Sequence, residues 1–425
     1  MRDILITLII FGLLPLAYKR PVVGALLFTW VSLMNPHRLA YGFAYNFPFA
    51  AVIAGVTLLG MLTTKDPKRL PLTPATTMLL VFAAWFTFTS FFALEPYMVW
   101  GEWNRVGKTY FMVIITIMLI NNTRDLKIFV WIVALSLGIF GLKGGLFTLA
   151  SGGHFRVYGP DGSYIAENNG MALALVTALP LIWYLRTQLT SKWLVLGMTL
   201  MTAMTAVSVV GSYSRGALVG GIAMLFFLWC HSPKKVQTAF VVVGVVAMIW
   251  AVMPSAWFDR MDTINEYNQD DSFMGRVNAW RFAVNIATTF PLGGGFNVFT
   301  PRMFMLYAPE PLNYHAAHSI WFQTLGDHGF IGLGMFISIM VCAWRTSTRV
   351  RKYCDTVPDL KWAATLARMC QVCIIGYAVS GSFLSLAYFD LYYDIIIILV
   401  CLEKILLPSR RKLPLRSPVP HVPAR

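Results

Sequence analysis

Charged residues are scarce in this sequence. They make up 12% of the 425 residues, while hydrophobic residues make up 57%, and a soluble domain usually carries about 25% charged residues. This shortage excludes an ordinary soluble globular protein. Apolar runs of roughly 15 to 25 residues recur from Leu5 to Leu406, and most can cross a bilayer core of about 30 Å as helices. The runs are continuous and do not alternate with polar residues, which excludes a transmembrane β-barrel.

The apolar runs predict an all-α polytopic membrane protein with about 12 or 13 transmembrane helices. The expected spans are 4–18, 21–36, 48–63, 74–93, 107–121, 128–149, 169–185, 193–211, 216–231, 236–253, 319–344, 362–383 and 387–407. The first run lacks a small-residue cleavage site, so we expect a retained anchor. The resulting division is N-terminal transmembrane helices over 1–253, a large loop over 254–318, C-terminal transmembrane helices over 319–407 and a disordered cytoplasmic tail over 408–425.

Acidic residues are fewer than basic ones, 19 against 34, and the net charge is +15. In a soluble protein this balance would favour nucleic acid as a partner. Here most lysines and arginines fall in alternate connections, at 19–20, 65–69, 124–127, 186–192, 234–235, 345–361 and 404–425. The positive-inside rule makes that side cytoplasmic. We therefore expect no nucleic-acid partner, and a functional site on the opposite, periplasmic face, where the long loop lies.

Cysteine and recognisable metal motifs are also sparse. None of the six cysteines falls on the expected outer side, so the sequence predicts no extracytoplasmic disulfide. Cys370 and Cys373 form C-x-x-C inside an apolar span, where packing is a better interpretation than redox chemistry or zinc binding. The chain has no H-E-x-x-H pattern and no Asp-x-Asp pair. We expect neither a metal nor an organic cofactor.

The first candidate site residue is Arg215, in Ser214-Arg215-Gly216 at the outer mouth between two apolar spans. An arginine in that position is costly unless it is paired or faces a polar cavity, so it suggests function. The alternative is an arginine that extends to the membrane interface.

The second candidate is Arg276 in the large loop. Apolar positions from Met274 to Phe290 predict an amphipathic helix lying against the membrane. Trp280 follows Arg276 by four residues and shares its face, whereas Arg281 faces elsewhere and is at most a secondary contributor. Near a helix start, Arg276 could present its planar donors to a phosphate group. The alternative is an arginine exposed to solvent or to lipid headgroups.

The third candidate is a group of histidines, His315, His318 and His328, at the outer start of a span. A histidine kept neutral by burial and nearby arginines is suited to accept a proton near pH 7. The alternatives are histidines that hydrogen-bond loop backbone, or a zinc site, for which no third ligand is evident.

Weaker candidates lie elsewhere. Arg105 and Arg156 could add positive charge to an outer cleft, and Lys143 could face a cleft or extend to the interface. Gly293-Gly294-Gly295 lacks the Lys-Ser/Thr of a phosphate loop and predicts a turn. Asp390 and Asp394, one helical turn apart, could line a cavity or pair helices.

The order of these motifs resembles the O-antigen ligase and polymerase superfamily. The resemblance rests on Ser-Arg-Gly at a span mouth, Arg276 with Trp280, the three glycines followed by Phe296, and His315-x-x-His318-Ser319 before Leu325-Gly-Asp-His-Gly. The stretches 34–39, 141–145, 261–264 and 315–319 are similar to O-glycosylation ligases associated with exosortase A systems. Ser319 departs from the wider family, in which asparagine commonly follows the key histidine; a hydroxyl still allows hydrogen bonding.

The resemblance implies a metal-independent, inverting, GT-C-like glycosyltransferase of the inner membrane, with its active site facing the periplasm. The donor is then a glycan on undecaprenyl diphosphate, and the acceptor a lipid A-core sugar or a protein. Arg215 and Arg276 would bind the diphosphate and His318 would be the base, with Arg281, His315, Trp280, Arg105 and Arg156 as secondary candidates. A repeat-unit polymerase is the nearest alternative. A polysaccharide transporter is a more distant one, because the sequence shows no internal repeat.

Overall fold

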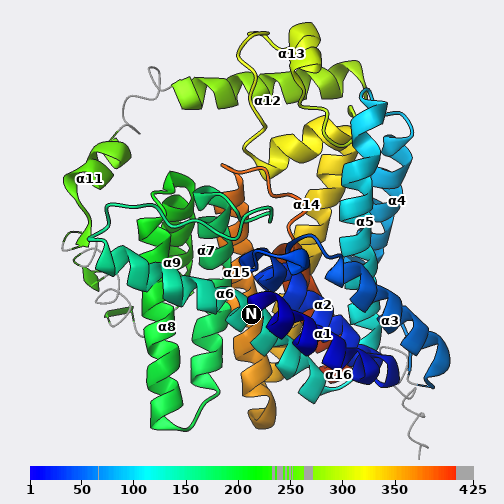
Figure 1. Cartoon of the computed structure of the whole chain (residues 1–425), viewed down its shortest axis with the longest axis vertical. Helices are drawn as coiled ribbons and strands as arrows, with labels where there is room; N and C mark the ends of the chain where they lie inside the picture. Colours follow the sequence, from blue (N-terminus) through cyan, green and yellow to red (C-terminus); the bar gives the residue numbers. More distant parts are fainter. Residues whose placement is uncertain are drawn as a thin grey trace, which may run out of the picture.

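The chain folds into helices throughout the part that the computed structural model describes (Figure 1). That part comprises residues 1–65, 67–231, 252–262 and 271–407, together with 235, 236, 243, 244, 247 and 250. Within it there are fifteen α-helices, three short 3-10 helices and no strand. The expected span 236–253 and the expected tail after Ser409 lie largely or wholly outside the described residues.

The first half of the chain forms eight α-helices and two 3-10 helices. They are α1 (Arg2–Lys19), α2 (Pro21–Met34), η1 (Pro36–Leu39), η2 (Phe43–Tyr45), α3 (Phe49–Thr63), α4 (Pro74–Ser90), α5 (Pro96–Leu119), α6 (Thr123–Ala150), α7 (Asn168–Thr187) and α8 (Lys192–Gly211). The second half contains α9 (Arg215–His231), α11 (Ser255–Asp262), α12 (Asp271–Thr289), α13 (Pro301–Tyr307), α14 (Ile320–Asp355), η3 (Pro358–Leu360), α15 (Lys361–Gly381) and α16 (Asp390–Leu406). Twelve of the thirteen expected spans thus coincide with separate helices.

Five helical segments in the described part are long and apolar enough to cross a membrane. They are Thr123–Ala150, Asn168–Thr187, Lys192–Gly211, Ile320–Asp355 and Pro358–Gly381. Four shorter apolar helices, α2, α3, α4 and α9, accompany them. The predicted class, an all-α polytopic membrane protein, is confirmed.

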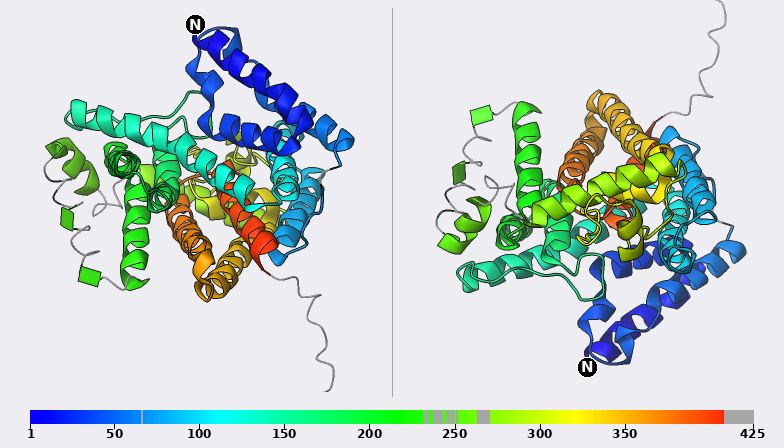
Figure 2. Two further views of the ribbon diagram at one scale, coloured as in Figure 1. Left: turned by 90° about the horizontal axis from the view of Figure 1, so that it is seen from below. Right: turned by 90° about the horizontal axis from the view of Figure 1, so that it is seen from above.

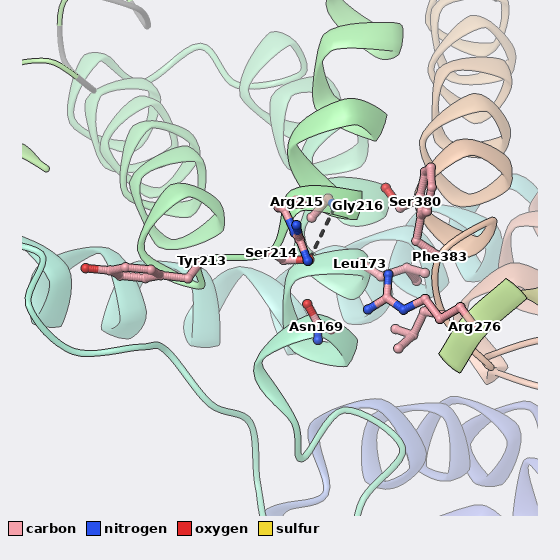
Figure 3. Close-up of a pocket in the computed structure, with 11 residues that line it drawn as sticks. Asn169, Leu173, Tyr213, Ser214, Arg215, Gly216, Arg276, Ser380 and Phe383 are labelled. Carbon is pink, nitrogen blue, oxygen red and sulfur yellow. Dashed lines mark hydrogen bonds between the residues drawn. The ribbon is translucent and has the colours of Figure 1, made fainter. Parts of the chain in front are cut away.

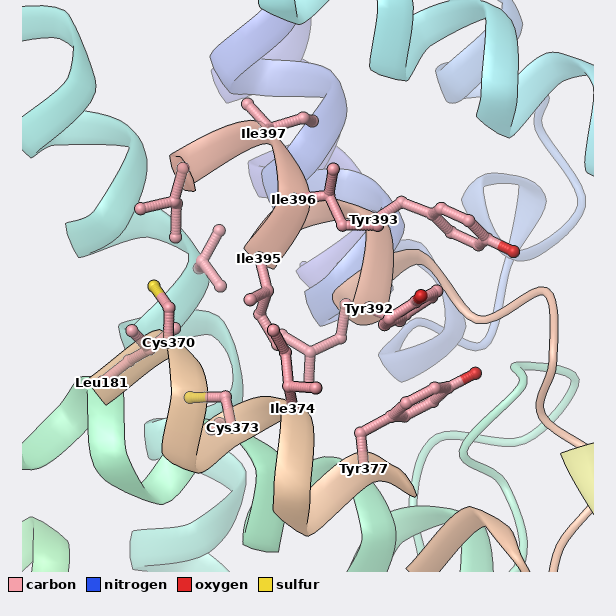
Figure 4. Packing of buried hydrophobic residues seen from close by; sticks show 14 of the residues in the cluster. Leu181, Cys370, Cys373, Ile374, Tyr377, Tyr392, Tyr393, Ile395, Ile396 and Ile397 are labelled. Carbon is pink, nitrogen blue, oxygen red and sulfur yellow. The ribbon is translucent and has the colours of Figure 1, made fainter. Parts of the chain in front are cut away.

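Helix α16 forms the centre of the bundle. Every residue from Asp390 to Leu402 is buried, and α16 contacts α2, α4, α5, α6, α7, α14 and α15. Figure 4 shows its tyrosines and isoleucines beside α15, where Tyr377 stacks on Tyr392 with ring centroids 4.5 Å apart. Cys370 and Cys373 are buried in the same layer, as expected of packing residues. Seen from below, α1 to α3 lie along one edge (Figure 2).

Helices α6 and α8 pack closely because small residues line their contact. A Cβ added at Gly144 or Gly145 would overlap Ser208 and the Met204 backbone of α8. Small residues allow membrane helices to approach at backbone distance. The glycines around Lys143 therefore serve packing, while Lys143 itself is exposed.

Helix α12 crosses the upper end of the molecule with α13 above it (Figure 1). It covers the expected helix 274–290, and its buried stripe includes Ala279, Phe282, Ala283 and Ile286. These residues pack against α13, the 296–304 segment and the outer half of α14. The expectation that this face lies on the membrane was therefore wrong, because a protein surface covers the apolar stripe.

Helix α14 is broken at Gly329, whose φ is 69° and ψ is −173°, a conformation that is essentially restricted to glycine. A break in a helix removes the backbone N–H groups that would otherwise donate to the carbonyls four residues earlier. The predicted turn at Gly293–Gly295 supplies replacements: Gly294 N donates to Gly326 O and Gly295 N to Asp327 O, each at 2.8 Å. The three glycines thus fix the large loop to α14.

Candidate active site

Arg215 is the first residue of α9, directly after a tight turn at 212–214. Asn168 Nδ2 donates to Ser212 O at 2.8 Å, and the hydroxyl of Tyr213, whose φ is 60°, donates to Gly153 O at 2.6 Å. Ser214 Oγ accepts from Ala217 N at 3.3 Å and caps the helix. The Ser-Arg-Gly motif is thus a capped helix start that projects its arginine from a fixed turn.

Arg276 lies near the start of α12. Its neighbour Gly275 packs directly under the His315 ring, where a side chain would overlap the imidazole. Further along, Asn278 Nδ2 donates to Glu310 O and Asn313 O, both at 2.9 Å. These contacts fix the histidine-bearing loop against the helix that carries Arg276.

Arg215 and Arg276, from separate helices, line the same pocket. Figure 3 shows the Arg276 side chain extending toward the side of the pocket where Arg215 and Asn169 lie. The remaining lining comes from α7, from the 213–217 turn and from the end of α15: Leu173, Tyr213, Ser214, Gly216, Ala217, Ser380, Phe383 and Leu384. The structure therefore brings together the two arginines that the sequence singled out, across 61 positions of chain.

The first turns of α7 and α9 also face this pocket, since Asn169 and Gly216 line it. Free backbone N–H groups and the helix dipole make such ends favourable for anions. Two guanidinium groups and two helix starts therefore converge on one space, an arrangement suited to an anion with several oxygens, such as a diphosphate.

His318 lies beside the pocket and is not among its lining side chains. Burial and the charges of Arg276 and His315 lower its pKa from 6.5 to about 4, so the imidazole is neutral at pH 7. Its φ is 42°, in a region that non-glycine residues seldom adopt and that is enriched at functional sites. His318 Nδ1 is buried and has no hydrogen-bond partner among the described residues.

Trp280 holds the residue before His318. Its Nε1 donates to Ala317 O at 2.8 Å, and its ring stacks on Phe322 of α14 with centroids 5.0 Å apart. Trp280 therefore fixes the backbone that positions His318, a role that its sequence spacing from Arg276 alone does not disclose.

The other predicted residues lie outside this group. Arg105 pairs with Glu102 at 2.7 Å and stacks over Tyr164. Arg156 is exposed, with its guanidinium 5.8 Å from the Tyr213 ring, and Arg281 is exposed on the far face of α12.

His328 was wrongly grouped with the outer histidines. It is fully buried, its Nδ1 lies 2.8 Å from Thr89 Oγ1, and aromatic rings including Phe82 and Phe296 surround it. Its burial and these contacts favour a structural role.

Sequence reasoning missed Asn169, Ser380 and Asn278. Asn169 could have been found from the Asn168-Asn169 pair, because two amides stand there at the start of an apolar span. Asn278 lies on an apolar helix face between Gly275 and Ala279, which is an unusual place for an amide. Among the described residues, no three His, Cys, Asp or Glu side chains gather as a metal site.

The fold and site thus define a multi-pass helical membrane protein with a cationic pocket at the end of the bundle that carries α12 and a neutral histidine beside it. Residues 200–337, which include Arg215, Arg276 and His318, match the O-antigen ligase family. Residues 1–190 match a family of unknown function (DUF5935). No curated protein matches the chain.

The predicted relationship to the O-antigen ligase and polymerase superfamily is therefore confirmed for residues 200–337. The match supports a membrane role of the O-antigen ligase or polymerase type, glycosyltransferase-like and in the context of lipid-linked glycans. The closer resemblance to exosortase-associated ligases stays a prediction.

Proposed function

We propose that this protein transfers a glycan en bloc from undecaprenyl diphosphate to an acceptor hydroxyl at the periplasmic face of the bacterial inner membrane. The acceptor is a lipid A-core sugar or a protein side chain. The observation that carries the proposal is the convergence of Arg215 and Arg276 in one pocket with His318 beside it. The O-antigen ligase family match over the same residues supports it.

The two arginines act on the leaving group. As the bond between the anomeric carbon and the phosphate oxygen breaks, its electron pair moves to the diphosphate. Arg215 and Arg276 stabilise the charge that develops there, through charge-assisted hydrogen bonds and without a divalent ion. The starts of α7 and α9 contribute further N–H donors.

His318 acts on the acceptor. Its neutral imidazole accepts the proton of the acceptor hydroxyl while the hydroxyl oxygen forms a bond to the anomeric carbon. A single in-line displacement inverts the configuration at that carbon. The imidazolium then releases its proton to water, and Trp280 keeps the His318 backbone in place throughout.

The test is glycan transfer by purified, reconstituted protein in the presence of EDTA. Lipid-linked glycan is offered with lipid A-core, with a hydroxyl-bearing peptide, or with a second lipid-linked glycan. We expect product with one of the first two acceptors; transfer only to the second lipid-linked glycan would identify a polymerase instead. An absolute requirement for a divalent ion would refute the metal-independent mechanism.

Variants assign the roles. Arg215→Ala and Arg276→Ala should each lower kcat/KM by about 10²–10³, and His318→Ala should lower kcat by about 10²–10⁴. Arg302→Ala and His154→Ala, which change exposed outer residues away from the pocket, are the matched controls and should keep wild-type rates. Wild-type kinetics in both pocket arginine variants would overturn the leaving-group role, and full activity of His318→Ala would remove the assigned base.

A further inference from the structure

A second, small pocket lies between α2, α5 and α16. It shares no lining residue with the arginine pocket. Its apolar wall comes from Phe28, Met112, Val113 and Ile397, and its polar wall comes from two aspartates and four hydroxyl-bearing residues. Two aspartates lining one pocket are unusual inside a helix bundle of this hydrophobicity.

The two aspartates, Asp390 and Asp394, are only 8% and 5% exposed. Ser32 Oγ donates to Asp390 Oδ2, whereas Asp390 Oδ1 and Asp394 Oδ2 have no hydrogen-bond partner among the described residues. An uncompensated carboxylate within a membrane-spanning helix is costly and usually marks a functional position. Asp394 in particular places an unpartnered, buried oxygen in the pocket.

The four hydroxyls, with the two carboxyl groups, make up the polar part of the lining. They belong to Thr29 and Ser32 on α2 and to Thr109 and Thr116 on α5. Thr29 donates its proton to Ala25 O and Thr116 donates to Met112 O, so the oxygen of each hydroxyl keeps lone pairs that can coordinate an ion. Apart from the thioether of Met112 in the apolar wall, the side-chain heteroatoms of the lining are all oxygens, and carboxylate and hydroxyl oxygens suit hard cations.

Positive charge near the pocket is limited to one side. No Lys, Arg or His lines it. Arg105 attracts Asp390 electrostatically, but it also pairs with Glu102. An ionised Asp394 therefore has no cationic side chain facing it from the pocket lining.

We propose that this pocket binds a sodium ion, held by Asp390, Asp394 and the hydroxyls of α2 and α5. One monovalent hard cation offsets the charge on Asp394 and occupies the unpartnered carboxylate oxygens. The ion joins α2 and α5, from the region that matches the family of unknown function, to the central helix α16. Its effect is on stability, and the arginine pocket carries out transfer independently.

The test is the thermal stability of the full-length protein in detergent, with NaCl compared with equal concentrations of KCl or N-methyl-D-glucamine chloride. Because an ion that binds only the folded state stabilises it in proportion to the logarithm of its concentration above Kd, the melting temperature should rise with NaCl alone. Bound radioactive sodium should saturate at one ion per chain. Equal melting curves in all three salts would overturn the proposal, as would stabilisation by CaCl₂ but not by NaCl.

Variants connect the effect to the pocket. Asp394→Asn should abolish sodium binding and the sodium-dependent rise, and Thr116→Val, a milder change, should raise the sodium concentration needed. Asp327→Asn is the matched control, since Asp327 is also buried in a spanning helix but hydrogen-bonds to Tyr388 at 2.9 Å outside the pocket. It should keep the sodium dependence even if its melting temperature changes. Retained sodium binding in Asp394→Asn would refute the assignment.

Infrared bands of protonated Asp390 and Asp394 that persist in saturating NaCl would show that protons occupy the site instead.

Discussion

At the scale of single residues, Arg276 has two effects. It lines the pocket together with Arg215, and its charge lowers the pKa of His318. The second effect keeps the proposed base neutral but also makes it weak, since a base with a pKa of about 4 gains little from accepting a proton at pH 7. A bound diphosphate would offset the charge of Arg276 and raise that pKa, so donor binding would strengthen the base.

This reasoning predicts different pH profiles for kcat/KM and kcat. The profile of kcat/KM reports the free enzyme, so its acid limb should lie near pH 4, below which His318 is protonated. The acid limb of kcat should lie at higher pH, because the bound diphosphate favours the imidazolium. Initial rates measured across pH 3.5 to 8, an interval that brackets about 4 and the unperturbed 6.5, check both. If the acid limbs of kcat and kcat/KM coincided, or if the limb of kcat/KM lay near pH 6.5, the assignment of His318 as the base would be contradicted. The control variant Arg302→Ala should show the wild-type profile.

At the scale of elements, α12 organises the site. Its apolar stripe packs on α13 and α14, and its polar residues Asn278 and Trp280 hold the loop that carries the histidines. The sequence predicted the helix correctly, because its apolar residues recur at helical spacing. The sequence wrongly predicted that the membrane covers the apolar face. Hydrophobic periodicity shows that one face of a helix is covered, but it does not show what covers that face.

We expect Asn278→Ala to loosen the 308–318 loop. The change removes bonds from Nδ2 to two carbonyls and the bond from Glu310 N to Oδ1 at 3.0 Å. Loss of such buried bonds costs about 1–3 kcal/mol. Hydrogen exchange should accelerate across 308–318, and kcat should fall more than donor affinity because His318 loses its position.

Asn285→Ala is the matched control on the same helix. Asn285 is exposed and makes one bond, from Nδ2 to Tyr307 O at 2.8 Å. Its replacement should leave exchange at 313–318 and kcat unchanged. If Asn278→Ala behaved in the same way, the loop would owe its position to Trp280 and packing alone.

At the scale of the whole molecule, the distribution of basic residues agrees with the arrangement of the helices. The basic connections between α7 and α8 and between α14 and α15 lie at one end of the bundle, and α12 and α13 lie at the other (Figure 1). The positive-inside rule predicts that the α12 end is periplasmic. This predicted orientation would put the arginine pocket where a lipid-linked glycan on the outer leaflet could reach it.

Cysteine labelling in intact cells tests the orientation. Leu312, at 90% exposure, lies in the outer loop, so Leu312→Cys should react with a membrane-impermeant thiol reagent from outside. Asp359→Cys, in the exposed connection between α14 and α15, should react only after the membrane is made permeable. The reverse pattern would place the proposed active site in the cytoplasm.

The sequence by itself determined the class of protein, the helices and the residue types of the site. Hydrophobic runs and basic connections are local patterns that follow directly from the cost of burying polar groups in lipid. Arg215, Arg276 and His318 were also identifiable, because charged and titratable residues at span mouths are conspicuous. Only the tertiary structure decided which of them meet. Convergence of α7, α9, α12 and α15, the direction of His328 into the bundle, and the pocket around Asp394 all depend on packing between residues far apart in the chain, which no local pattern encodes.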